Sequence, residues 1–278
     1  MKKMNIQKIG FIGGGNMASS LISGLITSGH SPQHLWVSDI NPDTLKILAE
    51  SFNINTSTSN DAVINAVDVI VLAVKPQALC SVAKSAAALI QQKKSLVVSI
   101  AAGISQHSLS QWLGADTAIV RCMPNTPALV LTGATALHAN AKVTAEQCNL
   151  AENIMRSVGI ALWVKDESEL DAVTAVSGSG PAYYFLLMEA MEKAALELGL
   201  SEVTARLLVQ QTALGAAKIA LESSESPEQL RKRVTSPGGT TQQAIETFEQ
   251  GGFTQLVSKA LHAARDRSIE MSKQSENT

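Results

Sequence analysis

The sequence predicts an α/β fold of two domains, in which residues 1–165 form a parallel sheet covered by helices and residues 166–278 form an all-α domain. A chain of 278 residues exceeds one average domain. In the first part, short apolar runs alternate with helix-period segments, which is typical of a parallel sheet with helices on both faces. From Pro181 onward we find no convincing strand.

The expected strands of the first domain are short apolar runs bounded by turn residues. They are Lys8–Ile12, His34–Asp39, Asp68–Val74, Ser95–Ile100, Thr117–Cys122, Ala134–His138 and Ala161–Val164. The nearly uninterrupted runs DVIVLAV and SLVVSI favour strands that are buried on both faces. The helix-period segments between the strands are Met17–Ser28, Pro42–Phe52, Gln77–Gln91 and Thr144–Val158.

Two long helices dominate the second domain. PAYYFLLMEAMEKAALELG has a proline in its first turn and Gly199 as its stop, and Ser201 is a suitable N-cap for EVTARLLVQQTALGAAKIALES. The latter helix is apolar or small on most faces, a pattern typical of a helix that is buried all round. A domain of this size does not easily bury two such helices alone. We therefore expect an intertwined homodimer, with a tight monomeric bundle as the alternative.

The composition excludes several classes of protein. A net charge of −2 gives no electrostatic support for binding nucleic acid or an anionic membrane, and no run reaches the roughly 18 apolar residues of a membrane span. Cys80, Cys122 and Cys148 have neither a disulfide pattern nor metal-ligand spacing, so we expect buried thiols. The N-terminal stretch is typical of a strand and a glycine turn rather than a signal peptide. We expect a soluble, cytoplasmic protein.

A glycine turn between the first strand and the first helix predicts a dinucleotide site. KIGFIGGGNMASSL contains the pattern Gly13-x-Gly15-x-x-Ala18. Gly13 permits a tight turn, Gly15 lets a pyrophosphate approach the backbone, and Ala18 keeps the helix close to the strand. The helix N-terminus would face the phosphates, so we expect a Rossmann-type domain rather than a merely structural turn. The other turn residues assigned to the cofactor are Gly14, Asn16 and Met17.

The end of the second strand bears on the choice of cofactor. Asp39 stands about 20 residues beyond the glycine turn, where an acid ordinarily binds the ribose 2′-hydroxyl of NAD. No Lys or Arg follows before Lys46 to bind the 2′-phosphate of NADP, although Ser38 and Asn41 could donate hydrogen bonds to a phosphate. These residues favour NAD, but they leave the choice between NAD and NADP open.

Two further strand ends are placed to border the nucleotide, because ligands of open α/β sheets bind beyond the carboxyl ends of the strands. The stretches LAVKP and SIAAG each end a buried strand in small residues or a turn. We assign Ala73, Val74, Lys75, Pro76 and Ala101 to this border, with a solvated surface position as the alternative for Lys75.

Three other stretches are not well explained by secondary-structure propensity. They are RCMPNTPALV (121–130), AVSGSGPAYYF (175–185) and VTSPGGTTQQAIETFEQGGF (234–253). In this order behind GFIGGGNMA and AVKP, they closely resemble pyrroline-5-carboxylate reductases, which catalyse the last step of proline biosynthesis. The resemblance covers essentially the whole chain, and SPGGTT followed by AIETFEQGGF is its most specific element.

The resemblance implies a Rossmann-type NADP-binding domain and a helical domain for dimerisation and substrate binding, in a homodimer or higher homo-oligomer. It implies hydride transfer from a reduced nicotinamide to the C=N carbon of 1-pyrroline-5-carboxylate, which gives L-proline. NADPH is the commoner donor in the family and NADH is an alternative. The resemblance thus favours NADP(H) over the inference from Asp39.

The SPGGTT stretch suits the carboxylate of such a substrate. A helix that begins near Thr240 or Thr241 leaves several backbone N–H groups unpaired, and these groups and the helix dipole favour a small anion. Gly238 and Gly239 let the backbone come close. By resemblance, Thr241 is the threonine that hydrogen-bonds near the ring nitrogen, and we take it as the catalytic residue. Ser236 and Thr240 match the carboxylate clamp.

Further residues are assigned by the resemblance alone. Asn60 and Asn125 are assigned to cofactor binding. The residues assigned to the substrate are Met123, Ser177, Pro181, Ser236, Gly239, Thr240 and Thr241.

We expect neither a metal nor a catalytic histidine. Protonation of the cyclic imine makes its carbon a good hydride acceptor, and the proton would come with the substrate, from water or via Thr241. One alternative function is that of a β-hydroxyacid dehydrogenase, which uses a lysine early in the first helix of its second domain; Lys193 comes too late for this role. Another is a nucleotide-binding protein without catalysis, which the intact SPGGTT disfavours.

Overall fold

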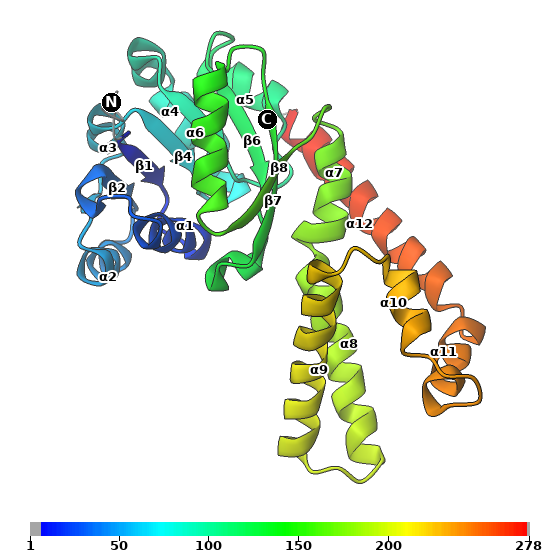
Figure 1. Ribbon diagram of the computed structural model, residues 1–278. Coiled ribbons are helices and arrows are strands. Elements are labelled where there is room, and N and C mark those ends of the chain that lie inside the picture. Colours follow the sequence, from blue (N-terminus) through cyan, green and yellow to red (C-terminus); the bar gives the residue numbers. More distant parts are fainter. Residues whose placement is uncertain (1–6, 277–278) are drawn as a thin grey trace. The chain divides into compact units, whose positions relative to one another are not determined.

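The computed structural model describes residues 7–276, which divide into two compact units. The first unit runs up to Ser179 and includes the chain again from Ala264 onward, and the second is Gly180–Ala263 (Figure 1). The first unit holds the sheet, and the second is helical.

One sheet forms the centre of the first unit. Its strands lie in the order β3-β2-β1-β4-β5-β6-β7-β8. Their bounds are β1 Ile9–Ile12, β2 Leu35–Ser38, β3 Asn55–Ser57, β4 Val69–Leu72, β5 Leu96–Ser99, β6 Ile119–Met123, β7 Gly133–Ala139 and β8 Gly159–Trp163. All seven strands expected from the sequence are present, and the predicted Rossmann-type arrangement is confirmed.

Two features of the sheet differ from the prediction. Strand β7 runs antiparallel to β6, whereas the other neighbouring strands are parallel. The 3₁₀ segment Thr126–Val130 that joins β6 to β7 is too short for a crossover helix, so the chain returns beside the strand it has just left. The edge strand β3 was not predicted, because its three residues are polar and only half-buried.

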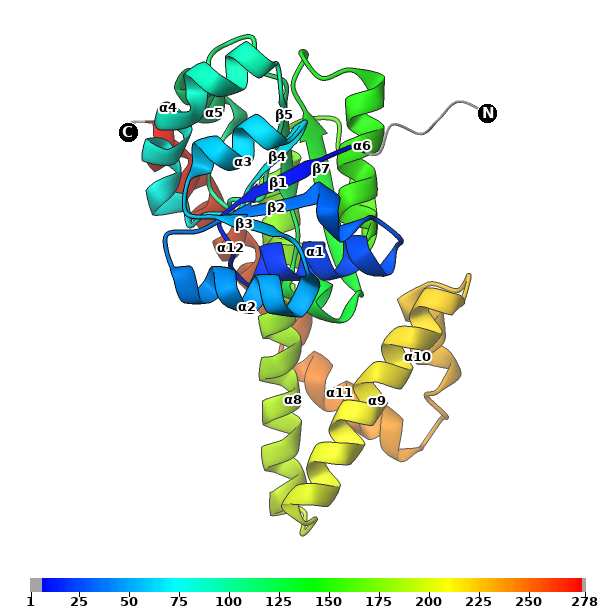
Figure 2. The ribbon, with the colours of Figure 1, turned by 90° about the vertical axis from the view of Figure 1, so that its left-hand side faces the viewer.

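Helices cover both faces of the sheet, and each face has its own core. One core joins α1, α2 and α6 to the strands through residues such as Leu21 and Met155. The other joins α3, α4 and α5 through residues such as Ile64 and Ile90. In Figure 2 the strands run between α3, α4 and α5 above them and α1 and α2 below. The helices of this unit are α1 Asn16–Thr27, α2 Pro42–Phe52, α3 Asn60–Ala66, α4 Pro76–Lys93, α5 Gln106–Leu113, α6 Ala145–Arg156 and α7 Glu169–Val173.

Strand β1 shows how the sequence produces these layers. Side chains alternate between the faces of a strand, so Phe11 belongs to the core with α1 and Ile12 to the core with α3. Gly10 lies against α3, where a Cβ would come within 2.7 Å of Cγ1 of Val63. The strand is therefore buried on both faces, and it delivers the glycine turn to the carboxyl edge of the sheet.

The segment after β8 packs on the first unit. Arg121, which is buried in β6, donates from Nη1 to Oε1 of Glu167 at 2.7 Å, and Leu170 of α7 is fully buried. After α7 the backbone widens into one π-helical turn, Thr174–Gly178. These contacts extend the compact unit to Ser179, and the predicted boundary between two folding domains stays a prediction.

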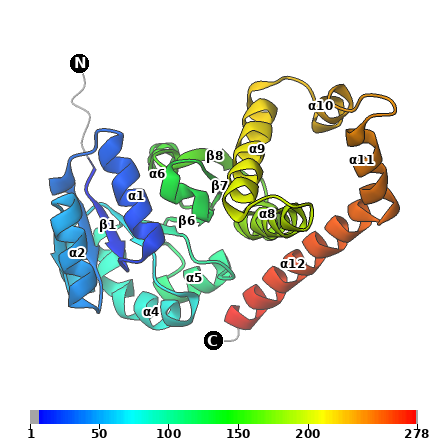
Figure 3. The ribbon, with the colours of Figure 1, turned by 90° about the horizontal axis from the view of Figure 1, so that it is seen from below.

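The second unit opens with two long antiparallel helices, α8 Gly180–Glu197 and α9 Glu202–Glu222, which lie side by side in Figure 3. Gly199, at φ +94°, ends α8, and the Ser201 hydroxyl accepts from the Thr204 N–H, so the predicted stop and cap are confirmed. Three helices follow in the chain: α10 Pro227–Arg233, α11 Thr240–Gln250 and α12 Phe253–Glu276. Helix α12 begins in the second unit, and from Ala264 onward it belongs to the first.

Helices α8 and α9 leave much apolar surface uncovered in the single chain. The exposed side chains include Tyr184, Phe185, Leu186, Val203, Leu207, Leu208 and Leu214. Large contiguous apolar patches on a folded protein mark interaction surfaces. This surface agrees with the expected homodimer and not with a tight monomeric bundle. Among residues 7–276, no helix combines the length and the hydropathy that a membrane span requires.

Candidate active site

Strand β1 ends in the glycine turn that the sequence assigned to a dinucleotide. Gly13 has φ +100°, and a Cβ there would lie 2.8 Å from the carbonyl oxygen of Ala73, so only glycine fits. Gly15 is exposed, and a Cβ there would meet nothing within 4 Å. As the N-cap of α1, Gly15 makes no side-chain hydrogen bond to the helix. The first N–H groups of α1, at Asn16 and Met17, therefore remain available to an anion.

Other helices of the chain are capped differently. Side chains cap six of them: Asn41 for α2, Ser59 for α3, Ser105 for α5, Thr144 for α6, Ser201 for α9 and Ser226 for α10. The N-caps of α1, α4 and α11, which are Gly15, Lys75 and Gly239, form no such bond, and neither does that of the five-residue α7. Three longer helices thus keep unpaired N–H groups at starts that the sequence assigned to ligands.

The LAVKP turn lies at the same edge of the sheet as the glycine turn. The Ala73 N–H donates to the Ile12 carbonyl oxygen at 2.9 Å, which ties the end of β4 to the end of β1. Lys75 is exposed directly before Pro76, the first residue of α4. Ala101, beyond β5, is buried. The structure brings these predicted border residues to one edge, and their contacts with a nucleotide stay predictions.

The Asp39 carboxylate is held by backbone N–H groups. Its Oδ2 accepts from Gly14 N at 2.7 Å, and its Oδ1 accepts from Asn41 N at 2.9 Å. Asp39 therefore joins the glycine turn to the start of α2, and it places a negative charge beside that turn. Asn41 caps α2 through its own side-chain oxygen, which accepts from Asp43 N at 2.9 Å.

Ser38 and Asn60 form a pair behind the same turn. The buried Ser38 hydroxyl donates to Oδ1 of Asn60 at 2.7 Å, so its hydrogen is already used within the protein. From the sequence alone, this hydroxyl is a candidate donor to a phosphate. In the structure it positions the Asn60 amide at the start of α3, and the cofactor contacts of both residues stay predictions.

Asn125 joins two of the unusual stretches. Its Nδ2 donates to the Ser177 carbonyl oxygen at 3.1 Å, and its Oδ1 accepts from Ala134 N at 2.9 Å. The side chain thus links the MPNTP turn, the start of strand β7 and the π-helical turn. A cofactor contact of Asn125 stays a prediction, but the structure gives this side chain a second role as a clamp on the backbone.

Met123 and Gly178 pack where these stretches meet. A Cβ on Gly178, the first glycine of SGSG, would come within 2.3 Å of Cε of Met123, so a larger residue there would have to move the end of the Met123 side chain. The Ser177 hydroxyl donates to the Val173 carbonyl oxygen at 3.2 Å, inside its own turn. The structure therefore brings Met123, Asn125 and Ser177 together, as the sequence predicted for one site.

The SPGGTT stretch forms a hollow at the start of α11 in the second unit. The hollow measures about 290 Å³ and is lined by Gly238, Gly239, Thr240, Gln242, Gln243 and Glu246. Gly238, at φ +70°, takes a conformation that glycine favours. Gly239 is the N-cap without a side-chain bond, and Thr240 and Thr241 follow as the first two helical residues. The predicted helix start is confirmed.

Basic side chains near the SPGGTT stretch are used elsewhere. Arg231, Lys232 and Arg233, at the end of α10, form ion pairs with Glu249, Glu228 and Glu225 respectively. The groups of the hollow that favour an anion are therefore the backbone N–H groups and the dipole of α11, while the Glu246 side chain adds a carboxylate to its lining.

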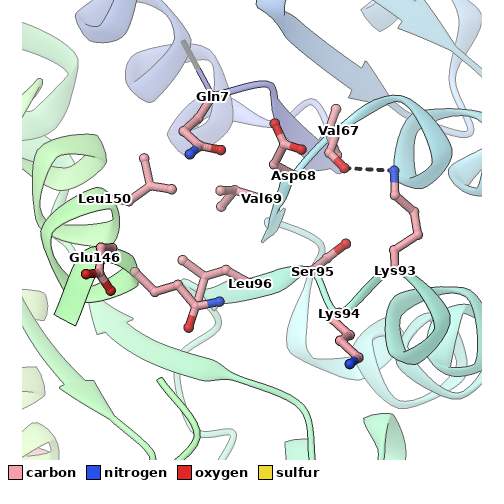
Figure 4. Close-up of a pocket in the computed structure, with 11 residues that line it drawn as sticks. Gln7, Val67, Asp68, Val69, Lys93, Lys94, Ser95, Leu96, Glu146 and Leu150 are labelled. Atoms are coloured by element: carbon pink, nitrogen blue, oxygen red, sulfur yellow. Dashed lines mark hydrogen bonds between the residues drawn. The ribbon is translucent and has the colours of Figure 1, made fainter. Parts of the chain in front are cut away.

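A second recess lies at the amino-terminal edge of the sheet, away from the residues that the sequence assigned to ligands. Figure 4 shows its lining, including Lys93 and Glu146. The Lys93 ammonium group donates to the carbonyl oxygens of Ile64, Asn65 and Val67 at 2.6–2.9 Å, and so it caps the end of α3. The recess contains no residue that the sequence assigned to a ligand.

Histidines and cysteines make local contacts. Nδ1 of His138 lies 2.9 Å from Oε1 of Gln106, and His262 lies 2.8 Å from the Ser258 carbonyl oxygen. The prediction of buried thiols is confirmed for Cys122, whose pKa is raised by burial, and is wrong for Cys80 and Cys148, which are only half-buried. Among the described residues, no cluster of three or more His, Cys, Asp or Glu side chains could hold a metal ion.

Comparisons with known proteins agree with this geometry. Residues 167–271 match the family described as pyrroline-5-carboxylate reductase dimerisation, and residues 8–103 match the family described as NADP oxidoreductase coenzyme F420-dependent. The chain is 51% identical to a pyrroline-5-carboxylate reductase of Pseudomonas aeruginosa over 271 residues, which cover 98% of this chain and 99% of the relative. The chain belongs to the pyrroline-5-carboxylate reductase family.

Solved structures of the family are similar along the whole chain. A pyrroline-5-carboxylate reductase of Coxiella burnetii has a TM-score of 0.92 at 47% identity, covering 96% of this chain and 99% of that one. A pyrroline carboxylate reductase of Plasmodium falciparum, solved with NADP bound, has a TM-score of 0.86 at 31% identity, covering 97% and 99%.

Three side chains that line the hollow, those of Gln242, Gln243 and Glu246, are not predicted from the sequence. Gln242 and Glu246 line it from the first and second turns of α11. Nothing in the sequence marks them, because polar residues on an amphipathic helix are ordinarily solvated. Their spacing of four residues, which puts them on the same helix face, is the one signal available.

We expect Asn125→Leu to destabilise the protein and lower its turnover. The substitution leaves the Ala134 N–H and the Ser177 carbonyl oxygen without partners, which costs about 1–3 kcal/mol of unfolding free energy. Thermal unfolding at one fixed protein concentration measures this loss. The control is Asn153→Leu on exposed α6 surface, which should change stability little. Equal stabilities of the two variants would contradict the clamp.

Proposed function

We propose that this protein reduces 1-pyrroline-5-carboxylate to L-proline with NADPH, and with NADH as an alternative donor. The observation that carries the proposal is the pair of glycine-led, uncapped helix starts, α1 behind Gly15 and α11 behind Gly239. Each offers backbone N–H groups to an anion, one in the sheet-containing unit and one in the helical unit. The cofactor and the substrate both carry anionic groups, so the two starts match the two ligands.

The glycine turn fits a dinucleotide. A side chain at residue 13 would clash with Ala73, whereas the space over Gly15 is open, so a pyrophosphate has room to approach the α1 N–H groups. Lys75 and the uncapped start of α4 lie at the same edge and would border the nucleotide. When bound, the reduced nicotinamide supplies the hydride.

The α11 start would hold the substrate. Free N–H groups at Thr240 and Thr241 would bind the carboxylate, with Ser236 as a nearby hydroxyl donor. Anchoring the carboxylate would fix the orientation of the ring, which favours hydride transfer to its C=N carbon. The Thr241 hydroxyl would hydrogen-bond near the ring nitrogen. The hydride adds to carbon and the nitrogen keeps or gains a proton, which yields the neutral ring amine of proline or its protonated form.

The active form is a homo-oligomer. The exposed apolar side chains of α8 and α9 need a cover, and residues 167–271 match a dimerisation family. A second copy of the chain is the economical partner, since two equivalent surfaces then bury each other. A cytoplasmic location stays a prediction from the sequence.

The direct test is oxidation of NADPH and of NADH by the purified protein with 1-pyrroline-5-carboxylate, followed by absorbance and by detection of L-proline. We expect proline to form in proportion to the cofactor oxidised, with the higher kcat/KM for NADPH. No turnover with either donor would overturn the proposal.

Thr241→Ala should lower kcat/KM by about 10- to 100-fold, which is the value of one hydrogen bond to a charged group. Thr247→Ala is a matched control, because that hydroxyl bonds only to the Gln243 carbonyl oxygen of its own helix. Steady-state kinetics of both variants measure kcat/KM for 1-pyrroline-5-carboxylate. Near-normal kcat/KM for Thr241→Ala would remove the residue from the catalytic role.

Asp39→Asn should shift the donor preference further towards NADPH. The substitution removes a negative charge beside the glycine turn and should raise the ratio of kcat/KM for NADPH over NADH by roughly fivefold. Asp43→Asn, in the first turn of α2, tests whether the effect is specific to residue 39. A ratio unchanged by Asp39→Asn would mean that the carboxylate only supports the turn.

A further inference from the structure

The side chain of Gln242 lies across the start of its own helix. Its Oε1 accepts from the Gly238 N–H at 2.7 Å, and its Nε2 donates to Oε1 of Glu246 at 2.7 Å. Both side chains line the hollow of SPGGTT, and both are half-buried. Gln242 therefore occupies one of the N–H groups that the helix start offers.

The orientation of this amide is fixed by its two partners. A backbone N–H can only donate, and the Glu246 carboxylate can only accept, so the oxygen must face Gly238 and the nitrogen must face Glu246. The amide is held at both ends, and Glu246 is the group that keeps its oxygen aimed into the hollow.

The Gln242 oxygen makes the contact that a carboxylate oxygen would make. The N–H groups of Gly238, Thr240 and Thr241 lie in one short segment at the helix start, whereas the Gly239 N–H already donates to the Ser236 carbonyl oxygen at 3.0 Å. In the structure the amide oxygen satisfies the donor at Gly238. A ligand carboxylate that uses this donor has to displace the amide first. Charge-assisted hydrogen bonds are stronger than neutral ones, so a ligand carboxylate can replace the Gln242 amide oxygen at the Gly238 N–H.

We propose that Gln242 is an internal competitor of the substrate carboxylate and thereby sets the KM of the enzyme. This inference rests on the proposed function, because it takes the hollow as the carboxylate site. Since only a form with Gln242 displaced binds the carboxylate fully, the apparent affinity is reduced by the fraction of that form. The exchange is complete before hydride transfer begins, so it affects KM and leaves kcat nearly unchanged.

The test is the KM for 1-pyrroline-5-carboxylate, at saturating NADPH, in wild type and in two variants. Gln242→Leu removes the competing oxygen while keeping a side chain of similar length. We expect its KM to fall by about two- to tenfold, which is the range of a neutral hydrogen bond, with kcat within about twofold. Gln242→Glu keeps an oxygen on Gly238 and adds a negative charge, so its KM should rise.

The matched control is Gln250→Leu, at the exposed end of α11 away from the hollow, which should leave KM and kcat unchanged. A higher KM for Gln242→Leu would mean that Gln242 binds the substrate, and this would overturn the inference. So would an unchanged KM, or a loss confined to kcat. Wild-type protein that does not turn over at all would instead overturn the proposed function.

Discussion

An α-helix begins with N–H groups that its own turns cannot satisfy, and the way this chain treats those groups organises both candidate sites. Six helices receive a Ser, Thr or Asn cap. Helices α1 and α11 instead begin behind Gly15 and Gly239, which contribute no side-chain oxygen. A cap stabilises a helix by about 1 kcal/mol. Because α1 and α11 lack such a cap, their first N–H groups are available to ligands.

Short polar side chains then position the loops around these starts. Asp39 ties the glycine turn to α2, and Asn125 ties the turn after β6 to the π-helical turn before α8. Each uses backbone groups as partners, so the geometry is set by main-chain atoms rather than by flexible side chains. A π-helical turn often marks a functional position, because its wider backbone leaves groups for other partners. Residues 174–178 take this form within the SGSG stretch.

Much of the fold follows from local patterns in the sequence. Uninterrupted apolar runs predicted the buried strands, and the Gly199 stop and the Ser201 cap placed the ends of α8 and α9. The antiparallel course of β7 was missed, because apolar runs do not record strand direction. The edge strand β3 has no apolar run at all. The start of α11 could be predicted, since glycines and hydroxyl residues before a helical period mark an N-terminus.

The contacts within the sites were harder to predict. Ser38 was assigned to the cofactor by its place at the end of a strand, and Asn125 by the family resemblance. Neither could show that these polar atoms already bond to Asn60, Ala134 and Ser177. Gln242 and Glu246 carried no signal, because their importance depends on where one amide oxygen points. Such contacts depend on which residues the tertiary structure brings together, and the pattern of a single sequence does not give this information.

The central claim is that the uncapped start of α11 binds the substrate through its carboxylate. The most direct measurement compares inhibition of the wild-type enzyme by L-proline and by pyrrolidine, which has the same ring without the carboxylate. The account predicts that L-proline competes with 1-pyrroline-5-carboxylate and that pyrrolidine binds at least about tenfold more weakly, as the loss of a charge-assisted hydrogen bond implies. Equal inhibition by the two compounds would contradict it.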